Sequence, residues 1–300
     1  MISARFINRG RRLHLQHGPI DLIIEASGDD VATAYRAAAT RFDTVLQELV
    51  DELPLLKTRT NREINSASGT VAKRMIHSAS QFRDQFTTPM IAVAGSVADE
   101  ILQAMCKATN LTKAYVNNGG DIALRLAPGQ TYTAGIISNP QQADIPATVT
   151  VNAADGIRGI ATSGRHGRSL SLGIADAVTV MARNASLADA AATLIANAVT
   201  LQDNPSIVRV AAQQVDPDSD LKDTAVTVDV GKLSPGEISA ALTSGVNYAQ
   251  RLHSRKLIDA AYLSLQGECR TLCSSSAKLN STGSVMRAQQ NNKQRLVANA

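Results

Sequence analysis

Residues 159–197 read GIATSGRHGRSLSLGIADAVTVMARNASLADAAATLIAN, and they hold the features that decide the fold. A loop rich in small residues leads into the apolar run 177–182 (AVTVMA), which is typical of a buried β-strand. An alanine-rich helix follows, for which Ser186 is the expected N-cap and Asp189 suits the positive end of the helix dipole. Asp189 and Thr193 are four residues apart, so they share one helical face. A carboxylate and a hydroxyl on one face suit a hard cation, and a capped core helix is the structural alternative.

The loop at 161–169 (ATSGRHGRS) brings positive charge and hydroxyl groups together between glycines. Two arginines and a histidine lie within four residues, and like charges repel each other unless something anionic lies between them. The loop therefore predicts an anionic small-molecule ligand, and an exposed basic loop is the alternative. Its candidate ligand-binding residues are Thr162, Ser163, Gly164, Arg165, Arg168 and Ser169.

His166 and Asp176 are the candidate catalytic residues of this region. An imidazole changes its charge near neutral pH, so His166 suits a general acid or base. A second hypothesis makes Ser163 a nucleophile with His166 as its base, but the sequence shows no acid that would orient the histidine.

The segment 117–121 (NNGGD) is expected at a turn between two strands. Paired glycines allow positive φ and an open backbone there, so Asn118, Gly119, Gly120 and Asp121 are candidate ligand-binding residues beside bare amides. A plain hairpin turn is the alternative. The chain contains neither a GxGxxG nor a Walker A motif, which disfavours an ordinary dinucleotide-binding or phosphate-loop domain.

Strand and helix patterns alternate along the rest of the chain, and the hairpins argue against a purely parallel sheet. Strands are expected at 5–7, 13–15, 21–26, 114–118, 122–126, 131–137, 147–152 and 224–230. Helices are expected from about Asp29 to Leu53, over 71–82, from Pro89, over 206–214 and from Pro235 to about Leu265. We therefore expect one α+β domain over 1–273, and a polar tail at 274–300 that is mobile or packs on a partner.

Composition narrows the classes of function. The chain has 300 residues, an apolar fraction of 44% and only 3% aromatic residues, so few side chains can stack on bases, and we expect no nucleic-acid partner. No apolar run reaches the length of a membrane span and the first residues lack an apolar signal, so we expect a cytosolic protein without membrane contact. The three cysteines do not indicate a disulfide framework, and Cys269 and Cys273 alone are a weak basis for a metal site.

Four segments resemble, in this order, the motifs of the ApbE superfamily, whose founding members are flavin transferases. They are 117–122 (NNGGDI), 161–164 (ATSG), 177–180 (AVTV) and 188–193 (ADAAAT). The resemblance covers roughly residues 20–260 and implies a compact α/β sandwich of mixed sheets and helices. It also implies that Asp189 and Thr193 hold Mg²⁺, that FAD is bound and split, and that FMN is esterified to a threonine of a flavin-acceptor protein.

The chain departs from the transferases at two places. They carry a longer H-I-D-P-x-T-G segment where this chain has 165–177 (RHGRSLSLGIADA), and Ala94-Gly95 stands where Lys-Gly is usual. The chain resembles more closely the little-characterised cytosolic branch of the superfamily, with its P-M-x-A-V-A-G helix at 89–95. That branch is linked to breakdown of N-heteroaromatic acids, which implies a flavin-dependent reductase with bound FAD or FMN and a ferredoxin-like electron donor.

Two further functions remain open. One is a cofactor-free hydrolase or isomerase of a small carboxylated ring, in which Arg165 and Arg168 clamp the carboxylate while His166 or Asp176 moves protons. The other is a flavin carrier without catalysis. We consider a homodimer as the assembly.

Overall fold

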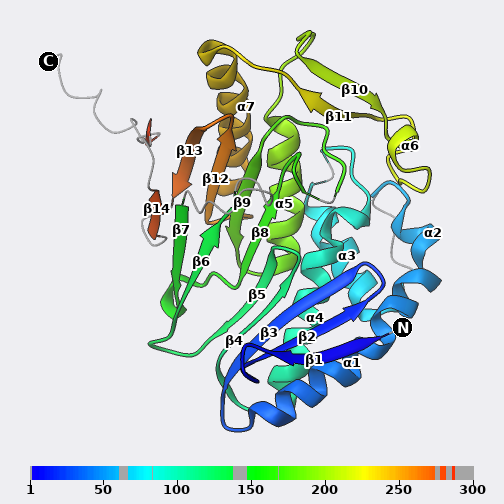
Figure 1. The fold of residues 1–300 in the computed structure, drawn as a ribbon, viewed down its shortest axis with the longest axis vertical. Coiled ribbons are helices and arrows are strands. Elements are labelled where there is room, and N and C mark those ends of the chain that lie inside the picture. Colours follow the sequence, from blue (N-terminus) through cyan, green and yellow to red (C-terminus); the bar gives the residue numbers. More distant parts are fainter. Residues whose placement is uncertain are drawn as a thin grey trace, which may run out of the picture.

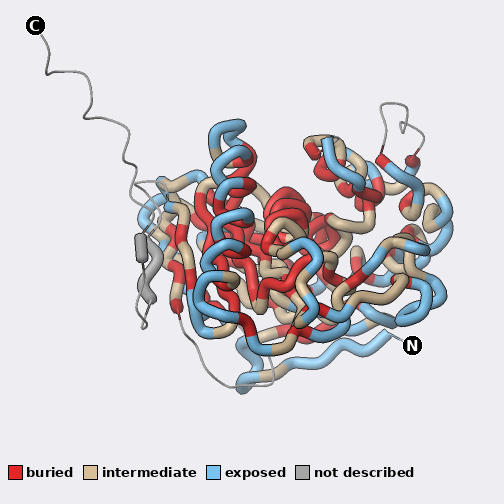
Figure 2. The backbone as a smooth tube through the Cα atoms, turned by 90° about the horizontal axis from the view of Figure 1, so that it is seen from above, coloured by how far each residue is buried: buried red, intermediate tan, exposed pale blue. Residues whose placement is uncertain are grey.

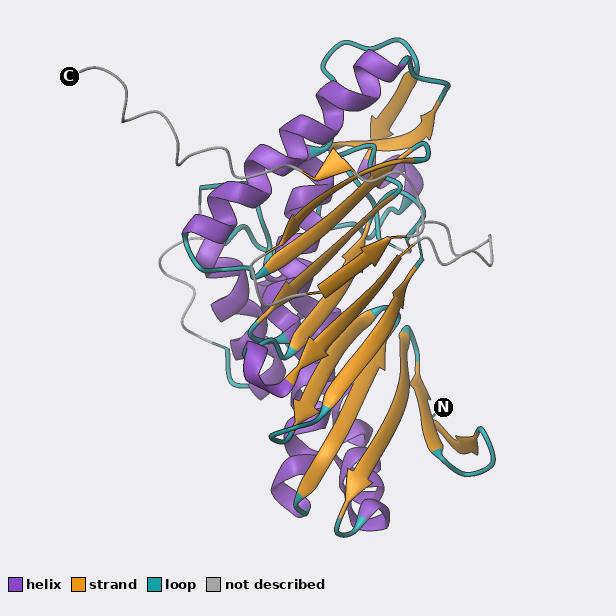
Figure 3. Cartoon of the chain, turned by 90° about the vertical axis from the view of Figure 1, so that its left-hand side faces the viewer, coloured by secondary structure: helices purple, strands orange, loops and turns teal. Residues whose placement is uncertain are grey.

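The computed structural model describes residues 2–60, 67–82, 84–137, 147–167 and 169–273, together with the backbone of 278–281 and 286–287. Over these ranges the chain forms a long, twisted sheet whose helices gather on one face (Figures 1 and 3). In spatial order its strands are β1 (Ser3–Ile7), β2 (Arg12–His17), β3 (Ile20–Gly28), β4 (Leu111–Asn118), β5 (Asp121–Leu126), β8 (Gly159–Ser163), β9 (Ala177–Ala182), β12 (Ala260–Leu265), β13 (Glu268–Cys273) and β15 (Met286–Arg287). The predicted α+β class is confirmed.

The helical layer contains four long helices and three shorter ones in the described ranges. They are α1 (Val31–Asp51), α2 (Leu53–Leu56), α3 (Thr70–Ala79), α4 (Val93–Ala108), α5 (Ala185–Ala198), α6 (Ala212–Val215) and α7 (Pro235–Ser254). Three 3₁₀ turns accompany them: η1 (Ser80–Phe82), η2 (Pro89–Ala92) and η3 (Ala153–Asp155). None of the helices in the described part of the chain is long and apolar enough to cross a membrane.

The long sheet contains two halves with the same order of elements. Strands β2, β3, β4 and β5 are neighbours, and α1 and α4 connect the middle two along the chain. Strands β8, β9, β12 and β13 are neighbours as well, and α5 and α7 connect their middle two. The halves meet where β5 pairs with β8, and there α4 of the first half packs against α5 of the second. The candidate site lies at this junction.

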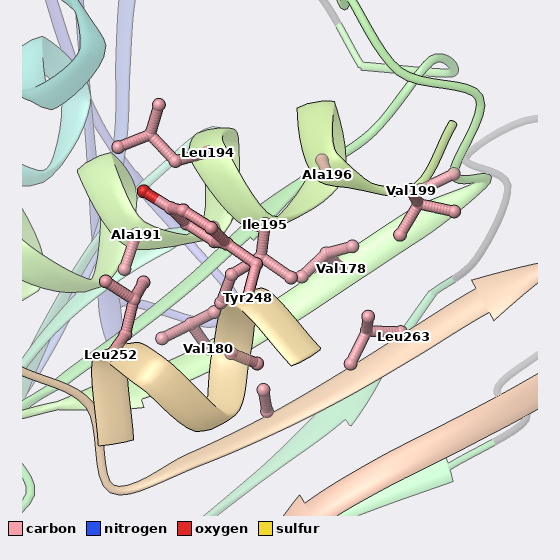
Figure 4. Close-up of a cluster of buried hydrophobic side chains, with 14 of the residues drawn as sticks. Val178, Val180, Ala191, Leu194, Ile195, Ala196, Val199, Tyr248, Leu252 and Leu263 are labelled. Carbon is pink, nitrogen blue, oxygen red and sulfur yellow. The ribbon is translucent and has the colours of Figure 1, made fainter. Parts of the chain in front are cut away.

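The central helix α5 is buried because small side chains let it lie close against the sheet. Ala188, Ala190, Ala191 and Ala192 are all fully buried. Figure 4 shows Val178 and Val180 of β9 and Tyr248 and Leu252 of α7 meeting side chains of α5 in one apolar cluster. Figure 2 shows the same layering, with buried backbone at the centre and exposed backbone at the rim.

A second layer covers part of the other face of the sheet. It consists of β6 (Thr131–Ile136), β7 (Ala147–Asn152) and β14 (Lys278–Ser281). Apolar side chains from β6 and β7, among them Ala134 and Val149, pack on Ile122 and Leu124 of β5. Outside this layer, β10 (Ile207–Ala211) and β11 (Ala225–Val230) form a separate two-stranded ribbon.

Three predicted elements are wrong. The N-cap of α5 is Asn184, whose side chain accepts from the Leu187 amide, while Ser186 is already helical. The expected helix over 206–214 is mostly β10, because the alternating Ile-Val-Arg-Val run pairs with β11. The helix from Pro235 ends at Ser254, since the later apolar run 260–265 is a buried strand between β9 and β13. In the predicted tail, only β14 and β15 are described, and the rest of 274–300 lies outside the described residues.

Candidate functional site at the junction of the two halves

Asp189 occupies the centre of the junction. It lies on α5 and is half-buried, and its Oδ2 accepts a hydrogen bond of 2.9 Å from the amide of Gly95 in the first turn of α4. Burial raises the pKa of Asp189 well above its ordinary value, and the nearby charge of Asp121 raises it further. The amides of Ala94 and Gly95 oppose this shift in pKa without cancelling it. Asp189 and Asp121 therefore form a carboxylate pair whose joint ionisation is unfavourable.

The NNGGD turn connects β4 to β5 and is docked against α4. Asn118 is 4% exposed, and its Nδ2 donates to the Ala94 carbonyl at 3.1 Å. Asn117 accepts from the Gly120 amide at 2.8 Å, and Gly119 and Gly120 have φ values of +64° and +115°, which side chains disfavour. The turn thus brings Asp121, which follows it, to the α4 end of the helical layer.

The two asparagines of this turn point to opposite faces of the sheet, because successive strand residues alternate. Asn118 faces the helices, while Asn117 borders an open hollow of about 370 Å³ on the other side. The hollow is lined by Asp21, Ile23, Asn117, Gly119 and Gly120. It is thus separated from Asp189 by the sheet.

The ATSG loop contributes one hydroxyl to the junction and not two. Ser163, the last residue of β8, lies with its Oγ 3.5 Å from the Thr193 Oγ1 on α5. Thr162 points to the opposite face, where its hydroxyl bonds that of Thr179 at 2.8 Å. Gly164 is required by packing, because a Cβ there would lie 2.4 Å from the Asp176 carbonyl oxygen.

The anion between the positive charges of this loop is a side chain of the protein itself. Arg165 Nε donates to Asp176 Oδ1 at 2.9 Å, and His166 Nε2 lies 3.3 Å from the same oxygen. The amide of Gln266 donates to the other oxygen of Asp176. The side chains of Arg165 and Asp176 are 22% and 12% exposed, so the pair is largely removed from water. The reason for expecting an external anion at Arg165 therefore no longer holds. His166 and Asp176, which the sequence offered separately as proton carriers, lie next to each other, so Asp176 is an acid that can orient the histidine.

The end of the loop is described only in part. Arg168 lies outside the described residues, and Ser169 is exposed at the surface. Cys269 and Cys273 both lie on β13, where Cys269 is buried and Cys273 is exposed. Within the described ranges, no group of three or more His, Cys, Asp or Glu side chains is placed to hold a metal ion. A cation at Asp189 would therefore need hydroxyl, carbonyl or ligand oxygens besides its carboxylates.

Sequence reasoning missed Asp99. This residue lies nearly two turns into α4, and its carboxylate accepts from the amides of Ala185 and Ser186 at the start of α5, at 3.1 and 2.9 Å. Burial raises the pKa of Asp99 as well. A signal was present in the chain, because residues 95–99 (GSVAD) and 185–189 (ASLAD) are similar and each ends in an aspartate.

Comparison with known proteins identifies relatives of this chain. A UPF0280 protein of Methanothrix thermoacetophila is 33% identical over 188 residues, which cover 61% of this chain and 76% of that protein. A UPF0280 protein of Methanopyrus kandleri is 37% identical over 161 residues, covering 53% of this chain and 61% of that protein.

Among solved structures, a mutant of the flavin transferase ApbE from Vibrio cholerae matches this chain. It has a TM-score of 0.46 at 13% identity and covers 88% of this chain and 98% of its own. The apo form of the flavinyl transferase ApbE from Pseudomonas stutzeri has a TM-score of 0.44 at 13% identity, with coverages of 92% and 95%. The family model described as AbpE bacteria matches residues 4–271, and the chain therefore belongs to this family, in agreement with the resemblance in its motifs.

Proposed function

We propose that this protein is an enzyme that binds FAD together with a divalent cation at the junction of its two halves and transfers FMN to a hydroxyl group of an acceptor protein. The observation that carries the proposal is the placement of Asp189, whose Oδ2 accepts from the Gly95 amide at 2.9 Å, one helical turn before Thr193, whose Oγ1 lies 3.5 Å from the Ser163 Oγ. The nearby carboxylate of Asp121 adds negative charge to this place. Family membership supports it, because the motifs that the chain shares with its superfamily resemble those of flavin transferases.

The donor set suits a hard cation such as Mg²⁺. Two neighbouring carboxylates repel each other in a buried place, and a divalent cation removes that repulsion. Asp189 uses one oxygen for the Gly95 amide and keeps lone pairs for a cation, which Thr193, one turn further along α5, can join with its hydroxyl. When bound, such a cation neutralises the diphosphate and makes its phosphorus easier to attack.

The N-terminus of α4 is not itself the phosphate site. Helix N-termini often bind phosphate through free amides. Here, at the start of α4, the amides of Gly95 and Ala94 are already directed at the Asp189 carboxylate. A diphosphate would therefore approach the site from the Asp189 and Ser163 side, with its charge matched by the cation.

The pair of His166 and Asp176 suits the proton transfer that such a reaction needs. The hydroxyl oxygen of the acceptor attacks the phosphorus of the FMN half, the bond between the two phosphates breaks, and AMP leaves. The proton of the hydroxyl passes to a base, for which His166, oriented by Asp176 at 3.3 Å, is the candidate. Arg165 holds Asp176 in place from the other side. No observation within the described residues favours the reductase, the hydrolase or the isomerase.

The test uses FAD, Mg²⁺ and a peptide that carries an acceptor threonine, followed by mass spectrometry. We expect a peptide adduct equal in mass to FMN less water, with one AMP released for each adduct. Asp189→Asn should abolish both products. Asp259→Asn is the matched control, because burial also raises the pKa of Asp259, and the charged neighbours of this residue are His253, Arg183 and Asp155, none of which belongs to the proposed site. Bound FAD that yields neither AMP nor adduct would overturn the transfer reaction.

A further inference from the structure

Helices α4 and α5 bind each other's first turns through one aspartate each. Asp99 of α4 accepts from the amides of Ala185 and Ser186 at 3.1 and 2.9 Å, and Asp189 of α5 accepts from the Gly95 amide at 2.9 Å. In each helix the aspartate lies four positions after a residue whose amide is bonded by the aspartate of the other helix: Asp99 follows Gly95, and Asp189 follows Ala185. The segments 95–99 and 185–189 are similar in sequence. The contact is therefore reciprocal and joins the two halves of the fold.

This exchange does more than cap two helices. Helix α5 has a cap of its own, since Asn184 Oδ1 accepts from the Leu187 amide at 2.8 Å. Helix α4 has none, because its first residue follows Ala92, which makes no side-chain capping bond. Asp99 of α4 thus accepts from the Ala185 and Ser186 amides of α5, which the local cap Asn184 does not bond.

The backbones of α4 and α5 are also in direct contact at the first turns of the two helices. A Cβ added to Gly95 would lie 2.3 Å from the Ala185 carbonyl oxygen and 2.8 Å from the Ser186 Cα. The helices can approach this closely only because residue 95 has no side chain. At such a distance any slide of α5 along α4 would break the Asp99 bonds and move Asp189.

We propose that Asp99 is a positioning residue for the cation site: it holds the start of α5 against α4, so that Asp189 and Thr193 face Asp121. This inference rests on the proposed function, because the cation is the species that these side chains would bind.

The first measurement is Mn²⁺ binding to the full chain, followed by electron paramagnetic resonance of the free ion. Asp99→Asn keeps the shape but removes the charge and one acceptor, and we expect the Kd for Mn²⁺ to rise about tenfold, as for other residues that orient metal ligands. Asn184→Ala is the matched control, because it removes the local cap of α5 and leaves Asp99 intact. A Kd for Asp99→Asn within about twofold of that for the control would overturn the positioning role.

The second measurement needs no metal and separates the two proposals. Amide hydrogen exchange at Gly95 should accelerate in Asp99→Asn, although Asp99 does not bond that amide, and exchange at Ser186 should accelerate in Asp189→Asn. In Asn184→Ala, exchange at Gly95 should stay near the wild-type rate. Wild-type protein that binds no Mn²⁺ would overturn the cation site of the proposed function. Unchanged exchange at both amides in the two aspartate variants would overturn the coupling itself.

Discussion

Replacing Asp189 by asparagine should change how the stability of the metal-free protein depends on pH. Burial and the charge of Asp121 raise the pKa of Asp189 above its ordinary value of 3.8 in the folded state. As pH rises through and above that ordinary value, the unfolded chain loses this proton first. The folded protein is therefore destabilised progressively, until the pH passes the folded pKa.

The size of the effect follows from the shift. Each unit by which the folded pKa exceeds the unfolded pKa costs the wild-type fold about 1.4 kcal/mol at higher pH. The asparagine side chain keeps an oxygen that can accept from the Gly95 amide, now 2.9 Å from Asp189, but it carries no charge against Asp121. The free energy of unfolding of Asp189→Asn should therefore exceed that of wild type by an amount that grows as pH rises from about 4 to 8. At the acid end of this range the difference should be smallest.

Urea unfolding in the presence of a chelator, at several pH values between about 4.5 and 8, measures this difference. Asp43→Asn is the control, because Asp43 is an exposed carboxylate on α1. Adding Mg²⁺ at the upper pH should stabilise wild type and leave Asp189→Asn unchanged. Parallel stability curves for wild type and Asp189→Asn across the pH range would refute the reasoning that Asp189 is destabilised by its surroundings.

Three other changes test the packing around the site. Asp176→Asn should lower the free energy of unfolding by about 3 kcal/mol in urea melts, because it leaves the largely buried Arg165 without its carboxylate, and a loss below about 1 kcal/mol would mark the pair as a surface interaction. Gly159→Ala should lower Tm strongly in a thermal melt, since a Cβ there would lie 2.0 Å from the Asn184 carbonyl oxygen, and an unchanged Tm would show that the backbones are not in contact. In the native protein a thiol reagent should modify the exposed Cys273 quickly and the buried Cys269 only on unfolding, and equal rates would contradict the burial of Cys269.

Local patterns in the sequence were sufficient where a segment's own residues settle its structure. The run 177–182 is a strand with the predicted bounds, and the paired glycines at 119–120 do form a tight turn between two strands. The capping residue of α5 was predicted two positions too late, because Asn184 and Ser186 are both good caps and only the backbone shows which one lies outside the helix.

Contacts between distant segments could not be predicted in this way. The run 260–265 is apolar throughout and shows no period that separates a strand from the end of a helix, and its pairing with β9 decides the matter. Arg165 was expected to bind a ligand because its partner Asp176 approaches it only after the loop folds back. Asp99 was missed because its partners, the amides of Ala185 and Ser186, are more than eighty residues away in the sequence.

Calorimetric titration of the metal-free protein with FAD, with and without Mg²⁺, tests the central claim most directly. If the carboxylates of Asp189 and Asp121 hold the cation that receives the diphosphate, FAD should bind tightly only when Mg²⁺ is present, and Asp189→Asn should lose that dependence. Equal FAD affinity in the two conditions, or an unchanged Mg²⁺ dependence in Asp189→Asn, would contradict the account.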